Sequence, residues 1–232
     1  MDTNLGRSRL SEQIQESILD AIRAGEFPAG QKLPSERSLM EMFEVGRPSV
    51  KEALLMLERK GFVRLQRGVA PVVVQPTPES AIGSIGDMVS MMLAEETRRS
   101  EFYGLRIMLE TCAALDAARE RDPAVIAGLE EALEHCRATA GQAAPFRDAD
   151  QAFHRCLMAA SRNGVADAFH RSLIEWGLFN PETGPELDRI HARVIAQHVR
   201  IIEAVRDGDC FAAAEALRRH LQTRHNAARE DG

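Results

Sequence analysis

Aromatic residues are scarce in this chain: they account for 5% of its 232 residues and include one tryptophan and one tyrosine. Its cores must therefore consist mostly of leucine, isoleucine, valine, methionine and alanine, and the abundance of alanine, leucine, glutamate and arginine favours helix. Cysteine is also rare, and Cys112, Cys136, Cys156 and Cys210 are far apart. This spacing excludes the CxxC patterns of metal and redox sites, so we expect reduced, mostly buried thiols.

Long apolar runs are absent as well. No stretch approaches the roughly 18 uncharged apolar residues that a membrane span needs. The N-terminal segment MDTNLGRSRLSEQIQ lacks the apolar centre of a signal peptide. We therefore expect a soluble, cytoplasmic protein with no membrane partner.

Positive charge is in the minority, with 29 lysines and arginines against 35 acidic residues and a net charge of −6. This balance argues against non-specific nucleic-acid binding by the whole chain. The distribution is uneven, because residues 31–70 contain eight basic and five acidic residues whereas residues 71–232 contain 18 basic and 25 acidic ones. A small basic segment joined to a larger acidic one indicates two domains with different tasks.

The N-terminal third of the chain combines helical and strand patterns. Apolar residues at helical spacing predict a helix over residues 9–24, and Ser35 is the expected N-cap of a second helix. A third helix begins at Arg47, and β-branched and alternating residues then predict two strands around a turn at Arg67–Gly68. Two helices joined by a short turn and followed by a β-hairpin make a winged helix-turn-helix domain, which we assign to residues 1–75.

The proline-containing stretch QPTPES marks the domain boundary, and we take residues 76–80 as a linker. The remaining residues, 81–232, show helical periodicity and no convincing strand. Candidate helices are expected near residues 80–97, 101–121, 123–140, 147–161, 164–178, 186–207 and 210–228. One of the breaks between them falls at Pro181–Pro185. The fold class is thus mainly α, with an all-helical bundle of six or seven helices after the winged helix-turn-helix domain.

The third predicted helix opens in an unusual way, with VGRPSVKEAL. Arg47 lies in the first turn, where the helix dipole favours negative charge. A recognition helix places its N-terminal residues against base edges and phosphates, and Arg47, Ser49 and Lys51 are residue types that make such contacts. The alternative is a solvated helix start with Pro48 in its first turn, which is common. The local positive charge and the order of the elements favour DNA binding.

Histidines and one aspartate are placed for metal binding in the second domain. Asp150 and His154 are four residues apart and share one helical face. His198 and His220 lie about ten residues on either side of a glycine turn, so an antiparallel helix pair brings them to the same height. Three imidazoles and one carboxylate suit Zn²⁺, Ni²⁺ or Mn²⁺. The alternatives are a surface or N-cap pair, ordinary core histidines, and His191 as the true partner on the same helical stripe.

The N-terminal residues also carry a family resemblance. The segment from Gly25 to Gly68, with LPSER, VGRPSVKEAL and LERKG, resembles the DNA-binding domain of GntR-type bacterial transcription regulators. The resemblance implies six operator contacts, the last two at a wing tip in the minor groove: Arg37, Arg47, Ser49, Lys51, Arg67 and Gly68. Gly46 stands where serine or threonine is usual, Lys51 replaces an arginine and Ala70 replaces a glycine. These departures alter expected DNA-backbone contacts, so the resemblance implies DNA binding without fixing the operator sequence.

The second domain resembles the all-helical FCD effector domain of the FadR-like branch of that family. The matching segments are LRIMLETCAALDAA, DADQAFHRCLMAASRNG and HVRIIEAVRDGDCFAAAEALRRHL. The resemblance implies a metal ion, zinc first and nickel or manganese as alternatives, on four ligands: Asp150, His154, His198 and His220. It also implies that Arg106 faces a cavity for a small organic acid, the alternative being a salt bridge to Glu110. Within this branch the chain looks most like sialic-acid-responsive repressors.

The sequence therefore predicts a ligand-responsive transcription regulator, a repressor by this resemblance. We expect it to bind a palindromic operator as a homodimer and to take a small carboxylate effector. A regulator that responds to metal alone, and a metal-dependent enzyme, are the alternatives. No HExxH motif is present, and no glutamate is expected near the histidines as a general base, so we do not expect an enzyme.

Overall fold

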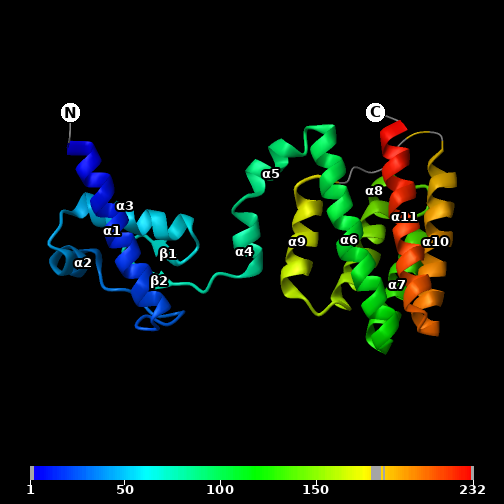
Figure 1. Ribbon diagram of the computed structural model, residues 1–232, viewed down its shortest axis with the longest axis horizontal. Coiled ribbons are helices and arrows are strands. Elements are labelled where there is room, and N and C mark those ends of the chain that lie inside the picture. The colour runs from blue at the N-terminus through cyan, green and yellow to red at the C-terminus, as the bar shows by residue number, and fades with distance from the viewer. Residues whose placement is uncertain (1–2, 179–183, 185, 231–232) are drawn as a thin grey trace. The chain divides into compact units, whose positions relative to one another are not determined.

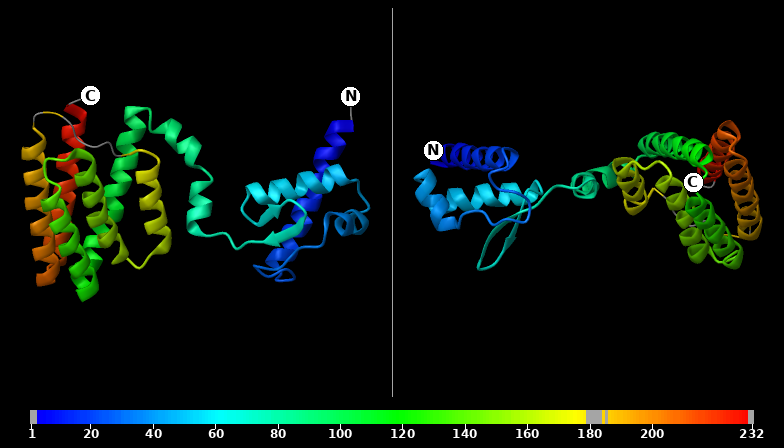
Figure 2. Two further views of the ribbon diagram at one scale, coloured as in Figure 1. Left: turned by 180° about the vertical axis from the view of Figure 1, so that it is seen from behind. Right: turned by 90° about the horizontal axis from the view of Figure 1, so that it is seen from below.

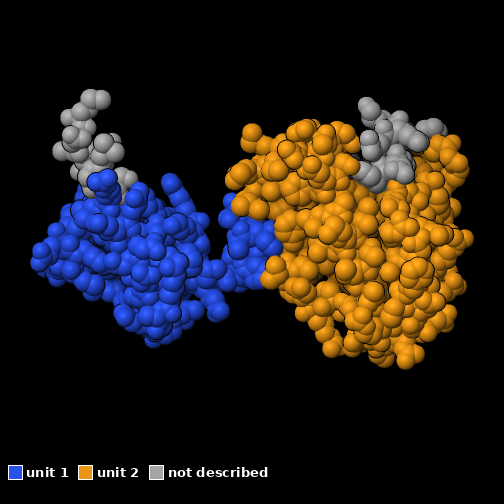
Figure 3. All heavy atoms as spheres, viewed as in Figure 1, with its two compact units in different colours: residues 1–84 blue, residues 85–232 orange. Residues whose placement is uncertain are grey.

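The computed structural model describes residues 3–178, 184 and 186–230. It divides into two compact units, Met1–Ser84 (unit 1) and Ile85–Gly232 (unit 2), and each is described by itself (Figure 3). The predicted fold class is confirmed, because helices form most of the described chain and the sheet is a two-stranded hairpin. Within the described ranges, every helix is too short or too polar to span a lipid bilayer.

Unit 1 consists of helices and a β-hairpin (Figure 1). In chain order its elements are α1 (Thr3–Arg23), α2 (Glu36–Phe43), α3 (Arg47–Arg59), β1 (Val63–Gln66), β2 (Val69–Val73) and α4 (Pro78–Gly83). The strands pair antiparallel, with Val63 opposite Val73, and the extended piece before α2 adds an isolated bridge from Lys32 to Val72. One core joins α1, α2, α3 and both strands through buried apolar side chains such as Ile14, Leu39, Val50, Leu57 and Val73.

Local signals set the helix-turn-helix. Ser35 caps α2, because its side-chain oxygen accepts a hydrogen bond from Ser38 N at 3.2 Å. Helix α2 ends at Glu44, which takes the left-handed conformation with φ 54°. Gly46 is the N-cap of α3 and gives it no side-chain hydrogen bond, and Pro48 occupies the first turn, where its missing N–H is not needed. These signals fix where α3 begins.

Unit 2 is a bundle of helices (Figures 1 and 2). They are α5 (Gly86–Met92), α6 (Glu96–Glu120), α7 (Pro123–Ala138), α8 (Ala143–Ala159), α9 (Gly164–Glu175), α10 (Leu187–Asp207) and α11 (Cys210–Glu230). Helix α6 runs beside α11 and also packs against α8, α9 and α10. Its buried face is rich in alanine, for example Ala113 and Ala117, and such small side chains let neighbouring helices approach closely. Helix α6 is therefore in contact with most of the bundle.

One expected helix is broken. The sequence predicts a continuous helix near residues 80–97, but the chain forms α4 and α5 there and starts α6 at Glu96. Gly86, the first residue of α5, lies against a distant ring, because a Cβ atom at this position would lie 2.8 Å from Trp176 Nε1. The start of α5 thus depends on a close approach to a distant ring, which local periodicity does not reveal. The expected break at Pro181–Pro185 lies mostly outside the described residues.

The cysteines are free thiols, as expected, but most of them are less buried than predicted. Cys136 is buried, whereas Cys156 and Cys210 are half-buried and Cys112 is exposed. Cys112 is exposed because it lies on the face of α6 that is opposite the alanine-rich one. The prediction of mostly buried thiols is therefore wrong.

Candidate functional site

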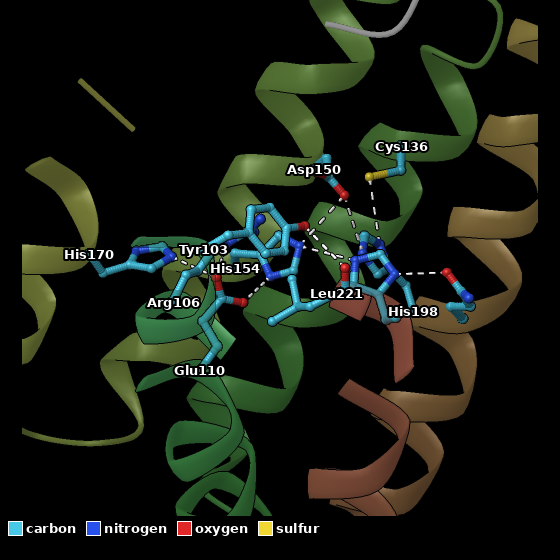
Figure 4. Close-up of polar contacts among 11 residues, drawn as sticks. Tyr103, Arg106, Glu110, Cys136, Asp150, His154, His170, His198 and Leu221 are labelled. Carbon is cyan, nitrogen blue, oxygen red and sulfur yellow. Dashed lines mark hydrogen bonds and ion pairs between the residues drawn. The ribbon is translucent and has the colours of Figure 1, made fainter. Parts of the chain in front are cut away.

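Four side chains meet at one point inside unit 2 (Figure 4). The ligand atoms of Asp150, His154, His198 and His220 all lie within 4.8 Å of one another, and all four residues are buried. His154 Nε2 is 3.3 Å from His220 Nε2, and His198 Nε2 is 3.3 Å from Asp150 Oδ1. The structure thus brings together the four residues that the sequence singles out as metal ligands, and we call them the Asp-His cluster.

Three helices supply the cluster. Helix α8 contributes Asp150 and His154, which lie one turn apart on the same face. Helices α10 and α11 are joined by a tight turn in which Gly208 takes φ 73°, a conformation that glycine adopts without strain. This turn makes the two helices antiparallel neighbours, so that His198 and His220 reach the same height.

The donor set fits a divalent ion of intermediate softness. Four ligands about 2.0–2.1 Å from a tetrahedral ion lie about 3.3 Å apart, which matches the shortest separations in the cluster. Each imidazole turns its Nε2 atom toward the other members. The cluster can therefore hold a metal ion with small inward movements of its side chains.

His191, the alternative partner, lies apart from the cluster. Its ring stacks on Phe146 with 3.6 Å between centroids, and its Nδ1 accepts a hydrogen bond from Gly141 N at 3.0 Å. His198 stacks on Phe153 in the same way, at 3.8 Å, yet its Nε2 faces Asp150. The two histidines of α10 thus share burial and stacking and differ in whether they face the cluster.

A buried carboxylate orients one of the cluster histidines. Glu110 on α6 accepts hydrogen bonds from His154 Nδ1 at 2.5 Å and from His170 Nε2 at 2.9 Å, and it pairs with Arg106 (Figure 4). Because Nδ1 of His154 donates to this carboxylate, the lone pair on Nε2 is left for a metal ion. Glu110 therefore supports the cluster without belonging to it.

Sequence reasoning missed these supporting residues. The sequence predicts no glutamate near the histidines as a general base, but the packing of α6 on α8 brings Glu110 against His154, where it orients the ring. Gln197 supports His220 similarly, since its Oε1 accepts a hydrogen bond from Nδ1 at 2.8 Å. The one available signal was that Glu110 follows Arg106 by four residues. No sequence pattern indicated Gln197 or His170.

The charges of this network are balanced within the bundle. Burial raises the pKa of the Glu110 carboxyl, but the charges of Arg106 and His154 and the hydrogen bonds from His154 and His170 hold it well below its usual range. Burial and Arg106 lower the pKa of His154, whereas Glu110 and Asp150 raise it, and the net shift is upward. Glu110 is therefore ionised and neutralises the buried guanidinium.

Arg106 lies in the interior of unit 2. It is 3% exposed, it pairs with Glu110, and its guanidinium carbon lies 5.6 Å from the centroid of the Tyr103 ring. The alternative role from the sequence, a salt bridge to the residue four positions later, is thus present in the structure. Because Glu110 also contacts His154, one carboxylate connects this arginine to the Asp-His cluster.

We expect Glu110→Gln to weaken metal binding by about 10–100-fold, because it removes the charged acceptor that orients His154. Calorimetric titration of the full chain with Zn²⁺ measures this change. Arg106→Gln is the matched control, since it removes the ion pair and keeps the carboxylate against His154. Equal losses of metal affinity in both variants, with equal losses of melting temperature, would mean that Glu110 acts through stability alone.

The predicted DNA contacts cluster on unit 1. A hollow of about 830 Å³ opens between α2, α3 and the hairpin. Five of the six residues predicted to contact the operator line it: Arg37, Arg47, Lys51, Arg67 and Gly68. Gly68 takes φ 76° at the tip of the hairpin, which explains the glycine at this turn. Basic side chains thus line this hollow both on the helices and on the wing.

Arg47 and Ser49 differ in accessibility. The Arg47 side chain is 75% exposed, and its Nε donates to Glu36 Oε2 at 3.0 Å. Such exposed pairs contribute about 0–1 kcal/mol, so this one offsets the unfavourable position in the helix dipole and leaves the guanidinium available to DNA. Ser49 is 5% exposed, so the predicted DNA contact through its hydroxyl is not supported by its placement.

Comparison with known proteins finds a family match in each unit. Residues 10–73 match the family "Bacterial regulatory proteins, gntR family", and residues 101–223 match the FCD domain, whose members often bind a metal. The HTH-type transcriptional repressor NanR of Citrobacter rodentium is 36% identical over 221 residues, which cover 94% of this chain and 85% of that protein. The repressor of the same name from Cronobacter sakazakii is 34% identical with the same coverage.

A solved structure shows the same fold. Streptococcus agalactiae GntR superposes with a TM-score of 0.58 at 20% identity, covering 94% of this chain and 99% of that one. The relatives are transcription regulators, so the expectation that this chain is not an enzyme is confirmed. The chain belongs to the GntR family of bacterial regulatory proteins and carries an FCD domain after its DNA-binding winged helix-turn-helix domain.

Proposed function

We propose that this protein is a cytoplasmic repressor that binds a palindromic operator as a homodimer and responds to a small organic acid bound near a metal ion in unit 2. The observation that carries the proposal is the connection from the Asp-His cluster through Glu110 to the buried Arg106. With a divalent ion bound, the positive charges of the ion and Arg106 would exceed the negative charges of Asp150 and Glu110 by one, which suits an anionic ligand.

The DNA side of the proposal rests on unit 1. Arg47 and Lys51 lie at the start of α3, and Arg67 lies at the wing, on the walls of one hollow. One recognition helix reads one half-site, so a palindromic operator requires two copies of the chain. We assign direct base contact to Arg47, phosphate contacts to Lys51 and Arg37, and minor-groove contact to the wing tip.

We propose zinc as the bound ion, with nickel or manganese as alternatives, because three imidazoles and one carboxylate suit these ions. When bound, the ion would supply a Lewis-acidic positive charge for a carboxylate. Arg106 would supply a second cation for the same ligand, and the ligand carboxylate would share Arg106 with Glu110. A ligand that binds two arrangements of unit 2 unequally shifts the population between them.

A regulator that responds to metal alone is the second candidate. The observation that favours it is that Arg106 is buried and already paired with Glu110, so the guanidinium is neutralised before any ligand arrives. The two candidates differ in whether an organic acid stabilises the metal-loaded protein.

A thermal-shift screen of organic acids, with and without a chelator, tests the proposal. An acid at about 100 times its dissociation constant adds about 2.7 kcal/mol, which corresponds to a rise of about 5–10 °C for a chain of this size. We expect such a rise for at least one acid, N-acetylneuraminate being included in the panel, and its loss after chelation. A rise that survives chelation would contradict the metal's part, and stabilisation by metal but by no acid would favour the second candidate.

A further inference from the structure

The outer face of α6 carries an apolar stripe that the bundle does not cover. Glu101, Leu105, Met108, Cys112, Leu115 and Arg119 follow one another at alternating spacings of four and three residues. This heptad-like spacing puts them on one side of the helix. Met108 is 63% exposed and Cys112 is exposed, while the two leucines are half-buried. Exposed apolar stripes with charged ends are typical of helix–helix interfaces.

The stripe is complementary to itself when it is reversed. Positions 108 and 112, 105 and 115, and 101 and 119 lie at equal distances from residue 110. In an antiparallel pair of α6 helices related by a two-fold axis at this height, Met108 therefore faces Cys112, and Leu105 faces Leu115. The same operation places Glu101 opposite Arg119 at both ends, because every contact of a two-fold interface occurs twice.

The charges at both ends remain available for this pairing. Glu101 accepts from Arg98 at 2.8 Å, and Arg119 donates to Asp116 at 3.0 Å, both within α6. These are exposed pairs between residues of one helix turn, and such pairs contribute little to stability. Glu101 and Arg119 can therefore reach a charge on a second helix without a large loss.

We propose that α6 forms the two-fold interface between two copies of this chain, antiparallel and centred at the height of residue 110. The inference rests on the proposed homodimer and adds its location and register. Arg106 and Glu110 lie on the opposite, buried face of the same helix. One helix thus carries the candidate effector residues on its inner side and the interface on its outer side.

A charge exchange on the full chain tests the register. Wild-type protein should have twice the 25.7 kDa mass of one chain by analytical ultracentrifugation. Glu101→Arg places two positive charges opposite each other, and Arg119→Glu places two negative charges there, so each should raise the dimer dissociation constant at least about tenfold. The double variant restores opposite charges and should return the constant to within about threefold of the wild-type value. A double variant no better than the single ones would overturn the register.

A charge in the middle of the stripe tests the face itself. Met108→Glu should give a folded monomer whose circular dichroism spectrum matches that of the wild type, because Met108 is exposed in the single chain. Met91→Glu is the control, since Met91 is 79% exposed on α5 and lies outside the stripe. A dimer that persists in Met108→Glu, or one that dissociates in Met91→Glu alone, would overturn the α6 interface. If every α6 variant still forms a dimer that binds the operator, the α6 interface is overturned but the proposed function is not.

Discussion

His198→Ala is expected to release the metal ion from unit 2, whereas His191→Ala keeps it bound. Both histidines lie on α10, both are fully buried, and both rings stack on a phenylalanine, at 3.8 Å and 3.6 Å. They differ in that His198 Nε2 faces Asp150 while His191 lies outside the Asp-His cluster. Loss of one ligand of four should cost more than the roughly 10–100-fold that follows from loss of an outer partner.

Metal content by mass spectrometry after dialysis, together with a Zn²⁺ titration, measures this difference. Both substitutions leave a cavity in the core, so in metal-free protein both should lower the melting temperature to a similar degree. That similarity makes His191→Ala a control for structural damage. Equal metal content in the two variants would mean that the Asp-His cluster does not hold the ion.

Arg47→Ala is expected to lower operator discrimination strongly and to leave the fold and the metal content unchanged. A bidentate contact to guanine contributes about 1–3 kcal/mol of base discrimination per half-site. Over two half-sites this amounts to a loss of roughly 30-fold to twenty-thousand-fold in the ratio of specific to non-specific affinity. The ion pair between Arg47 and Glu36 is exposed, so removing it should change the free energy of unfolding by less than about 1 kcal/mol.

Two variants separate base reading from general charge. Arg23→Ala removes an exposed cation of α1 that lies outside the hollow, so discrimination should stay near the wild-type value. Glu36→Ala removes the partner of Arg47 and should leave operator binding equal or tighter. Competition between operator DNA and random-sequence DNA gives the ratio of specific to non-specific affinity for each variant. The salt concentration is held fixed because affinity for DNA depends strongly on salt. Near-normal discrimination in Arg47→Ala would contradict the assignment of α3 as the recognition helix.

Much of the fold could be predicted because its signals are local. Ser35 as an N-cap, the α3 start at Arg47 and the glycine turn at Gly208 are each set by a few neighbouring residues. Local rules also set the two halves of the Asp-His cluster, namely a spacing of one helical turn on α8 and a shared height across one tight turn. They left His191 as an alternative partner, and the meeting of the two halves depends on helix packing and was implied only by the family resemblance. For such local features, the spacing of residues in the sequence largely determines their relative positions in the structure.

The features that the sequence missed depend on contacts between distant segments. Glu110 reaches His154 because α6 packs against α8, and Gly86 is required because Trp176 lies beside it. Periodicity identifies the face of a helix that is buried and does not identify what that face meets.

On this proposal, a small organic acid and a metal ion in unit 2 together set the affinity of the protein for DNA. Fluorescence anisotropy with operator DNA from upstream of its own gene tests this most directly, in metal-loaded and chelated protein, with and without the stabilising acid. We predict that the acid changes the dissociation constant by about 5–150-fold in the metal-loaded protein and has no effect after chelation. The same dissociation constant in all four conditions would contradict control of DNA binding by the acid and the metal ion.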